Sequence, residues 1–256
     1  MAWQNPKTNW TGADGVRDAD LNRIEHNTQH LFENLGFLRQ YIDDSLYALN
    51  QRVALNDVQI GSEFALYENG ILVPFIKLSN DYASSGRALV VRKNSYMSSP
   101  LQEGSFGYYA DSYVDRFLNE AYPLALDEAT RAVLSDVSIS VSAFNGISAI
   151  SRKVFLLSRT EYNFSGNPVE GTVNYHFINP DRRIANFDGM AYEHWTRTII
   201  YDDAVANFIT NTGALGMGHP VEFTAGVRPA FTLPTGFNVI IGTPNTANTL
   251  ATAEVI

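Results

Sequence analysis

A ladder of mostly leucine and isoleucine residues near the start of the chain restricts the fold more than any other feature. Its members are Leu21, Ile24, Thr28, Leu31, Leu35, Leu38, Ile42, Leu46, Leu49 and Val53. The steps alternate between three and four residues as far as Ile42, which places these side chains on one narrow seam of a helix. Two successive steps of four then form a stutter, at which a coiled coil unwinds locally. We therefore expect residues 18–58 to form a parallel coiled-coil stalk.

The predicted helix has a readable start and a less definite end. Asp18 is a suitable N-cap residue, and Asp20 places negative charge at the positive end of the helix dipole. We expect the helix to end between Leu55 and Asp57, before Gly61. The alternative is an ordinary amphipathic helix that docks on the globular part of the same chain. The narrow seam favours association between chains, because a docked helix usually shows a broader apolar face.

Composition and charge exclude several classes of protein. The chain has 256 residues, a formal net charge of -9 and no cysteine. An acidic chain without a basic patch is a poor partner for nucleic acid, and no disulfide or cysteine-ligated metal can form. No apolar run approaches the roughly 20 residues of a membrane span. The first ten residues lack the features of a secretory signal. We expect a soluble protein that is assembled inside a cell.

After the helix the pattern changes to short β runs. Ser62 to Tyr67, Ile71 to Leu78 and Arg87 to Arg92 read as strands, and the Asn69-Gly70 pair between the first two is a strong hairpin signal. Two short helices are expected, near residues 111–119 and 127–134. Further β runs follow, with Gly, Asn and Asp loops between them: 137–141, 154–157, 174–177, 195–201 and 226–233. This order predicts an α+β domain with few helices and long loops.

The first thirty residues carry one resemblance to a known group. The string Trp3-Gln4-Asn5-Pro6-Lys7-Thr8-Asn9-Trp10, then Val16, and then Asp20-Leu21-Asn22-Arg23-Ile24-Glu25-His26-Asn27 resembles the N-terminal module of structural proteins from phages that infect Gram-positive bacteria. In those proteins the module precedes a fibre or a receptor-binding part. The resemblance implies a virion protein that attaches to other virion proteins through residues 1–17.

A second resemblance covers residues 64–233. The segments that carry it are Tyr109 to Asn119, Lys153 to Ser158 with Glu161-Tyr162, Tyr192 to Arg197 and Gly226 to Phe231. They resemble the landmarks of C-type-lectin-like domains related to the formylglycine-generating-enzyme fold. The resemblance implies a mixed α/β head with long loops over a compact sheet. The enzymatic branch of that fold uses cysteines, which this chain lacks, so the resemblance implies a display scaffold.

Three large polar or aromatic residues have two readings. Trp195, Arg197 and Arg228 look functional, but in the related domains the equivalent strings hold the core together. An arginine buried against carbonyl groups or against a carboxylate such as Glu161 is structural. We therefore predict that these three residues stabilise the head and bind no ligand.

Signals for metal binding and catalysis are weak. His26 and His30 lie one helical turn apart, a spacing that can bind a metal, but two solvated side chains are the more common outcome. Asp181, Asn186 and Asp188 offer oxygen ligands without the spacing of a known calcium loop, and so do Asp202 and Asp203. No nucleophile motif or phosphate-binding loop is present. We predict no enzyme, no metal and no cofactor.

The best candidates for ligand contact lie in loops between Ala185 and Pro220. We name Tyr192, Tyr201, Asp202 and Asp203, because an aromatic face and carboxylate acceptors suit a sugar, and because aromatic residues give large contact area at low entropic cost. Their alternative reading is plain surface connection.

The combined prediction is an α+β chain in which a parallel coiled-coil helix precedes a C-type-lectin-like head. The predicted parts are an attachment segment (1–17), a stalk (18–58), a head (59–240) and a C-terminal tail (241–256). We expect a phage fibre or tail protein, a homotrimer assembled in the host cytoplasm that binds a host-surface glycan and binds no nucleic acid. The alternatives are a purely structural decoration or collar protein and, third, a cell-wall hydrolase.

Overall fold

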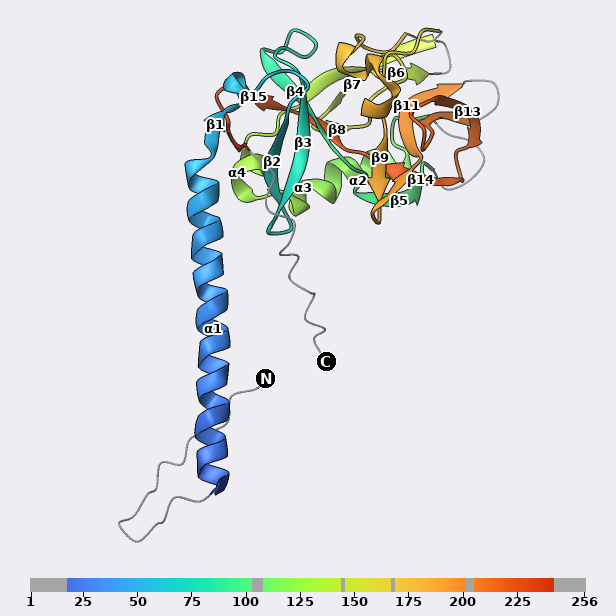
Figure 1. Cartoon of the computed structure of the whole chain (residues 1–256). Helices are drawn as coiled ribbons and strands as arrows, with labels where there is room; N and C mark the ends of the chain where they lie inside the picture. The colour runs from blue at the N-terminus through green and yellow to red at the C-terminus, as the bar shows by residue number, and fades with distance from the viewer. Residues whose placement is uncertain (1–17, 103–107, 144–145, 167–168, 201–204, 242–256) are drawn as a thin grey trace. The chain divides into compact units, whose positions relative to one another are not determined.

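The N-terminal part of the described chain is one long helix. The computed structural model describes residues 18–102, 108–143, 146–166, 169–200 and 205–241, and helix α1 runs over Asp18–Asn50 (Figure 1). Five members of the ladder are at least half exposed, namely Leu21, Ile24, Leu31, Leu35 and Leu38. Residues 1–51 form one compact unit, and the chain from Arg52 onwards forms a second unit, which we call the head.

The helix ends earlier than the sequence pattern indicates. Residues 52–58, expected in the stalk, belong to the head, where Arg52–Ala54 form strand β1 and Leu55–Asp57 form the 3-10 helix η1. The N–H of Leu55 donates to the carbonyl of Phe237 (2.8 Å). The buried ammonium group of Lys77 donates to the carbonyls of Leu55 and Val58, both at 2.7 Å. Tertiary partners thus take the backbone groups that another turn of α1 would use.

The predicted fold class is wrong. The chain is mostly β, with 40% of its residues in strands and 24% in helices, and not an α+β chain with a coiled-coil helix and a mixed α/β head. No coiled coil is present among the described residues, since α1 is a single helix with its ladder exposed. The spacing of the ladder correctly indicated a helix, but such spacing does not itself supply a partner. In the head the described α-helices are short, and the strands carry the architecture.

The larger sheet of the head has seven strands in the order β1-β16-β2-β3-β4-β15-β8. Besides β1 these are β2 (Glu63–Glu68), β3 (Ile71–Ser79), β4 (Arg87–Arg92), β8 (Val154–Phe155), β15 (Ala230–Pro234) and β16 (Asn238–Ile240). Every pair in this sheet is antiparallel. The first and last described strands of the head, β1 and β16, pair with each other.

The predicted hairpin between the first two long strands is confirmed. Strands β2 and β3 pair from Glu63↔Ile76 to Glu68↔Ile71. Asn69 and Gly70 form the turn, with φ values of 51° and 79°. A two-residue turn with positive φ at both positions matches the twist of the strands that it joins, and Asn-Gly adopts it at low cost.

A second sheet has five strands in the order β13-β12-β11-β14-β5. Their bounds are β5 (Met97–Pro100), β11 (His194–Ile200), β12 (Val205–Ile209), β13 (Leu215–Pro220) and β14 (Thr224–Val227). Two two-stranded ribbons complete the β structure, one of β6 (Val137–Ala143) and β7 (Gly146–Arg152), the other of β9 (Ala185–Phe187) and β10 (Met190–Tyr192).

Short helices connect the sheets. The two helices expected from the sequence are present as α2 (Tyr113–Glu120) and α4 (Glu128–Ala132), with α3 (Tyr122–Ala125) between them. The hydroxyl of Ser112 caps α2 by accepting from the N–H of Asp115, and the carboxylate of Asp127 caps α4 in the same way. The 3-10 helices η2 (Tyr175–Ile178) and η3 (Pro180–Arg182) lie in the connection to β9.

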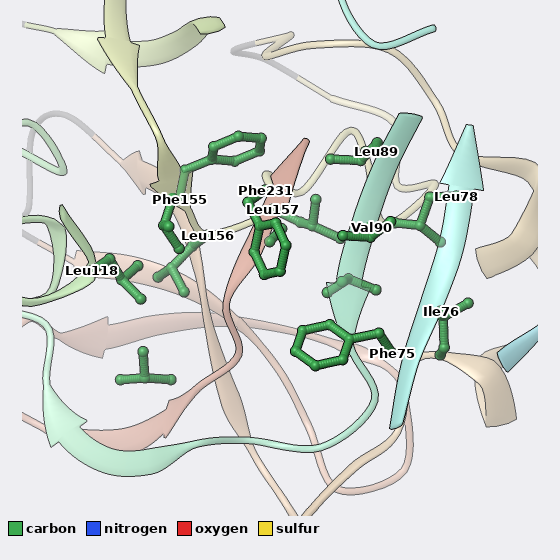
Figure 2. Close-up of a cluster of buried hydrophobic side chains, with 14 of the residues drawn as sticks. Phe75, Ile76, Leu78, Leu89, Val90, Leu118, Phe155, Leu156, Leu157 and Phe231 are labelled. Carbon is green, nitrogen blue, oxygen red and sulfur yellow. The ribbon is translucent and has the colours of Figure 1, made fainter. Parts of the chain in front are cut away.

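One continuous hydrophobic core fills the head. Figure 2 shows a part of it in which side chains from β3, β4, β8 and β15 meet, among them Phe75, Val90, Phe155 and Phe231. The rings of Phe75 and Phe231 pack edge to face, with their centroids 5.5 Å apart. No helix among the described residues is long and apolar enough to cross a membrane.

Candidate functional site

The centre of the head is a buried ion pair. Both side chains of the pair, Arg197 and Glu161, are fully buried. The guanidinium group of Arg197 donates to the two carboxylate oxygens of Glu161 at 2.6 and 3.0 Å, and also to the carbonyls of Ser140 (2.9 Å) and Leu156 (2.8 Å). Burial lowers the pKa of Arg197, and the adjacent carboxylate of Glu161 more than reverses this, so the pKa lies above its usual value.

The carboxylate of Glu161 has two further donors. The hydroxyl of Tyr82 donates at 2.7 Å and the N–H of Ser158 at 2.9 Å. Burial, followed by the negative charge of Glu161, raises the pKa of Tyr82 well above its usual value. Gly171 lies directly against this carboxylate, because a Cβ atom there would stand 2.5 Å from Oε1 of Glu161. This closely enclosed group has no room for a ligand.

A second buried carboxylate, Glu170, lies in the same region. Its oxygens accept from the hydroxyls of Ser142 (2.5 Å) and Thr198. Burial raises the pKa of Glu170, and the positive charge of Arg197 opposes that rise. Two hydroxyl groups thus donate hydrogen bonds to this side chain.

The other two residues with an ambiguous reading are also buried. The indole of Trp195 donates to the carbonyl of Ser99 (2.8 Å). Arg228 donates to the carbonyls of Arg92 (2.9 Å) and Arg183 (3.1 Å). Since Trp195, Arg197 and Arg228 are each no more than 1% exposed, their place in the core agrees with the predicted structural role.

The predicted ligand residues are only partly described. Tyr192 is half-buried on β10, where its hydroxyl accepts from Ser98 (3.2 Å) and its ring lies 5.7 Å from that of Phe187. Tyr201, Asp202 and Asp203 lie outside the described residues. The described residues therefore do not test whether these four side chains lie together, and the cluster stays a prediction.

The weak metal candidates are not brought together. Among the described residues no group of three or more His, Asp or Glu side chains is arranged to hold a metal ion. The N–H of Asp181 binds the side chain of Asn179 in the cap of η3. On α1, Nε2 of His30 lies 3.0 Å from the amide nitrogen of Asn34.

The strongest candidate site is a polar groove beside α2, which the sequence did not indicate. Its volume is about 350 Å³. The lining side chains come from α2 and its approach, from the segment before β6 and from the end of β7: Asp111, Asp115, Arg116, Asn119, Glu120, Asp136, Ser151, Arg152 and Lys153. Seven of these nine residues are charged, and they carry both signs.

A buried carboxylate orients an arginine side chain in the groove. The side chain of Asp115 is 1% exposed, and its oxygens accept from Nε of Arg152 at 2.9 Å and from Nη2 at 2.7 Å. The hydrogen bonds that Arg152 donates to the carboxylate of Asp115 are the main cause of the raised pKa of Arg152. Nη2 of Arg152 also donates to the carboxylate of Asp111 (3.1 Å), which is exposed. This arrangement fixes the guanidinium group before any ligand arrives.

The amide of Asn119 joins α2 to the neighbouring strand. Its nitrogen donates to the carbonyl of Val154 (2.9 Å), and its oxygen accepts from the N–H of Lys153 (3.1 Å) and of Val154 (3.3 Å). Since α2 and the β7–β8 connection are tied together in this way, the walls of the groove have a rigid frame. Above this frame Arg116, Glu120, Asp136 and Lys153 are exposed.

The groove presents hydrogen-bonding groups of both kinds. The lining contains carboxylates, an amide, a hydroxyl and basic side chains, which together donate and accept hydrogen bonds in several directions.

A second cavity of about 300 Å³ is less suited to a polar ligand. Its lining includes residues of β2 and β16, which share the pair Ile240↔Ala65. Most of its lining is strand backbone and apolar side chains, with Arg52 and Asp127 as the charged residues.

Comparison with known proteins identifies the family of the chain. No curated protein and no solved structure matches it. One family model matches residues 85–235, which span β4 to β15 and include both the buried ion pair and the polar groove. The chain belongs to the family described as "Domain of unknown function (DUF6273)".

Proposed function

We propose that the chain is a binding protein of a phage virion, assembled in the host cytoplasm, whose head holds a glycan of the host surface. The observation that carries the proposal is the open, charged groove beside α2. In this groove the buried carboxylate of Asp115 holds the guanidinium group of Arg152 in place. The virion assignment rests on the resemblance of the first thirty residues to phage structural proteins. The lectin-like assignment rests on the landmarks between residues 64 and 233.

The groove offers what a sugar requires. Its volume lies at the lower end of the range of about 300–1,000 Å³ that is typical of ligand pockets. Carboxylates accept hydrogen bonds from sugar hydroxyls, while Arg152 and Lys153 donate to ring and carboxylate oxygens. Because Asp115 already fixes Arg152, binding costs less ordering of that side chain.

Several heads on one assembly would strengthen a weak site. We propose a homotrimer, as the resemblance to phage fibre proteins implies. A shared attachment raises the effective concentration of the second and third heads and thereby multiplies avidity. Residues 1–17 would attach the assembly to other virion proteins.

The test is an array of bacterial surface polysaccharides probed with the whole chain. We expect binding by the wild type and its loss in Asp136→Ala with Lys153→Ala, since both side chains are exposed in the groove and neither supports the core. The matched control is Arg131→Ala with Glu222→Ala, which also removes one charge of each sign from exposed positions outside the groove.

A second variant separates the groove from the predicted loop. The triple variant Tyr201→Ala, Asp202→Ala and Asp203→Ala should keep binding if the groove is the site. Loss in this variant, with binding retained in the groove variant, would move the site to the loop. A wild-type chain that binds no polysaccharide on the array and does not adsorb to bacteria would favour a purely structural role.

A further inference from the structure

Strand β7 has a partner on one side only. It pairs with β6 through seven consecutive residue pairs, from Val137↔Arg152 to Ala143↔Gly146, without a register shift. The ribbon has no third strand among the described residues (Figure 1). The row of backbone N–H and C=O groups on the other edge of β7 is therefore a template for another β-strand.

The other described sheet edges are better protected. On β6, the carbonyl of Ser140 already accepts from Nε of Arg197. Strand β5 ends at Pro100 and β13 at Pro220, and proline cannot continue a ladder. Strands β1, β8, β9 and β10 have three residues or fewer. Strand β7 has seven residues and contains neither proline nor lysine. Apart from Arg152 at its end, it lacks the devices by which proteins usually block pairing at an edge.

The direction of one carbonyl identifies the residues that face outward. The carbonyl of Ser151 accepts from Nη1 of its neighbour Arg152 (2.9 Å). It therefore points away from β6. Because backbone groups alternate in direction along an antiparallel pair, those of Ile147 and Ala149 point outward as well. The side chain of Ile147 is 47% exposed, which is high for a large apolar residue in a strand.

We propose that β7 pairs antiparallel with β7 of a second copy of this chain, about a two-fold axis at Ala149. In that register Ala149 lies opposite its own copy, and Ile147 lies opposite Ser151. These pairs use the outward-facing backbone groups. The pairing continues the ribbon of each head into a ribbon of four strands.

The sequence of β7 is complementary to itself in this register. Like charges directly opposite each other destabilise a strand pair. The only charged residue of β7, Arg152, lies opposite Gly146, and its charge is already neutralised by Asp115. Ser148 lies opposite Ile150, so no two bulky side chains collide. A second copy is thus a suitable occupant of the edge.

This contact does not use α1, but it shares Ser151 and Arg152 with the lining of the groove. A two-fold contact between identical surfaces is closed by two copies. It therefore cannot itself complete a trimer, and it joins the heads of two assemblies instead.

The test is the mass of the full chain in solution, measured by sedimentation over a range of concentrations. We expect the wild type to form a species with twice the mass of the Ala149→Pro variant. Proline removes the outward N–H and is tolerated at such an edge position. Ala149→Val is the matched control, because valine keeps the N–H and favours strands, and it should keep the doubled mass.

A second variant and a second background make the outcome decisive. Ile147→Lys places a charge at the edge and should halve the mass without changing the core. The doubling should persist in a chain that carries Leu31→Asp and Leu38→Asp, because the edge does not use α1. Equal masses for the wild type, Ala149→Pro and Ile147→Lys would overturn the proposal. Halving by Ala149→Val would overturn it as well.

Discussion

Removal of either partner of the buried ion pair should destabilise the head strongly. Arg197→Met leaves the carboxylate of Glu161 without its cation in a fully buried place, and Glu161→Leu leaves the guanidinium group without its anion. Breaking a buried pair on one side costs about 3–5 kcal/mol, because an uncompensated charge remains. We expect each single variant to lower the free energy of unfolding by an amount in this range.

The double variant should cost less than the sum of the two single variants. With both charges gone, the unpaired-charge penalty disappears, and the remaining cost is that of imperfect packing and of the lost hydrogen bonds to Tyr82, Ser140 and Leu156. We expect an interaction energy of about 2–3 kcal/mol between the two sites, at the upper end for residues in contact. Tyr82→Phe is a control that keeps both charges, and it should cost about 1 kcal/mol.

The measurement is urea denaturation followed by tryptophan fluorescence. The chain has three tryptophans, Trp3, Trp10 and Trp195. In a background with Trp3→Phe and Trp10→Phe, Trp195 is the only reporter, and it is buried beside the ion pair in β11. Strictly additive costs would refute this reasoning, and so would single variants that lose less than about 1 kcal/mol.

Three further results are expected. Burial lowers the pKa of His176 to about 4, so the fold prefers the neutral form of this side chain. Stability present above pH 6.5 should therefore fall as the pH drops towards 4, and urea denaturation across this range should show a weaker pH dependence in His176→Gln. Burial raises the pKa of Glu170, so the wild type should lose stability as the pH rises through that pKa, whereas the denaturation midpoint of Glu170→Gln should not follow this part of the pH profile. Arg228→Ala should lower the thermal midpoint of the head at a cost of about 3 kcal/mol, because carbonyl groups lose their donor and a cavity forms, and loss of binding with unchanged stability would contradict its structural role.

Local patterns in the sequence predicted only part of the local structure. The β run expected at 174–177 is wrong, because this segment forms the 3-10 helix η2. The Asn69-Gly70 turn and helices α2 and α4 were all readable, because each depends on residues within a few positions of one another. The fold class could not be predicted, because the order of strands in a sheet depends on pairing between segments that are far apart in the sequence. Strand β15, for example, lies between β4 and β8. No periodicity within a short window indicates such neighbours.

The candidate site illustrates the same limit. The groove depends on the contact between Asp115 on α2 and Arg152 on β7, which are 37 positions apart. In the sequence, Asp115 is one of several acidic residues in an amphipathic helix. Only the fold shows that it is buried and that it orients an arginine. The structural role of Trp195 and Arg228 was expected from the sequence, whereas the partners that hold these side chains were not.

The pairing of the first and last strands of the head determines how it carries a pulling force. Arg52 lies opposite Ile240, so the chain enters β1 beside the point where it leaves β16. A pulling force between these two ends would separate β1 from β16 one residue pair at a time. Separation in this order needs little force. After β1, however, the ammonium group of Lys77 donates hydrogen bonds to the carbonyls of Leu55 and Val58. Separation of β1 from β16 would therefore stop at Lys77. The force would act on the remaining strands of the sheet only after these two hydrogen bonds break.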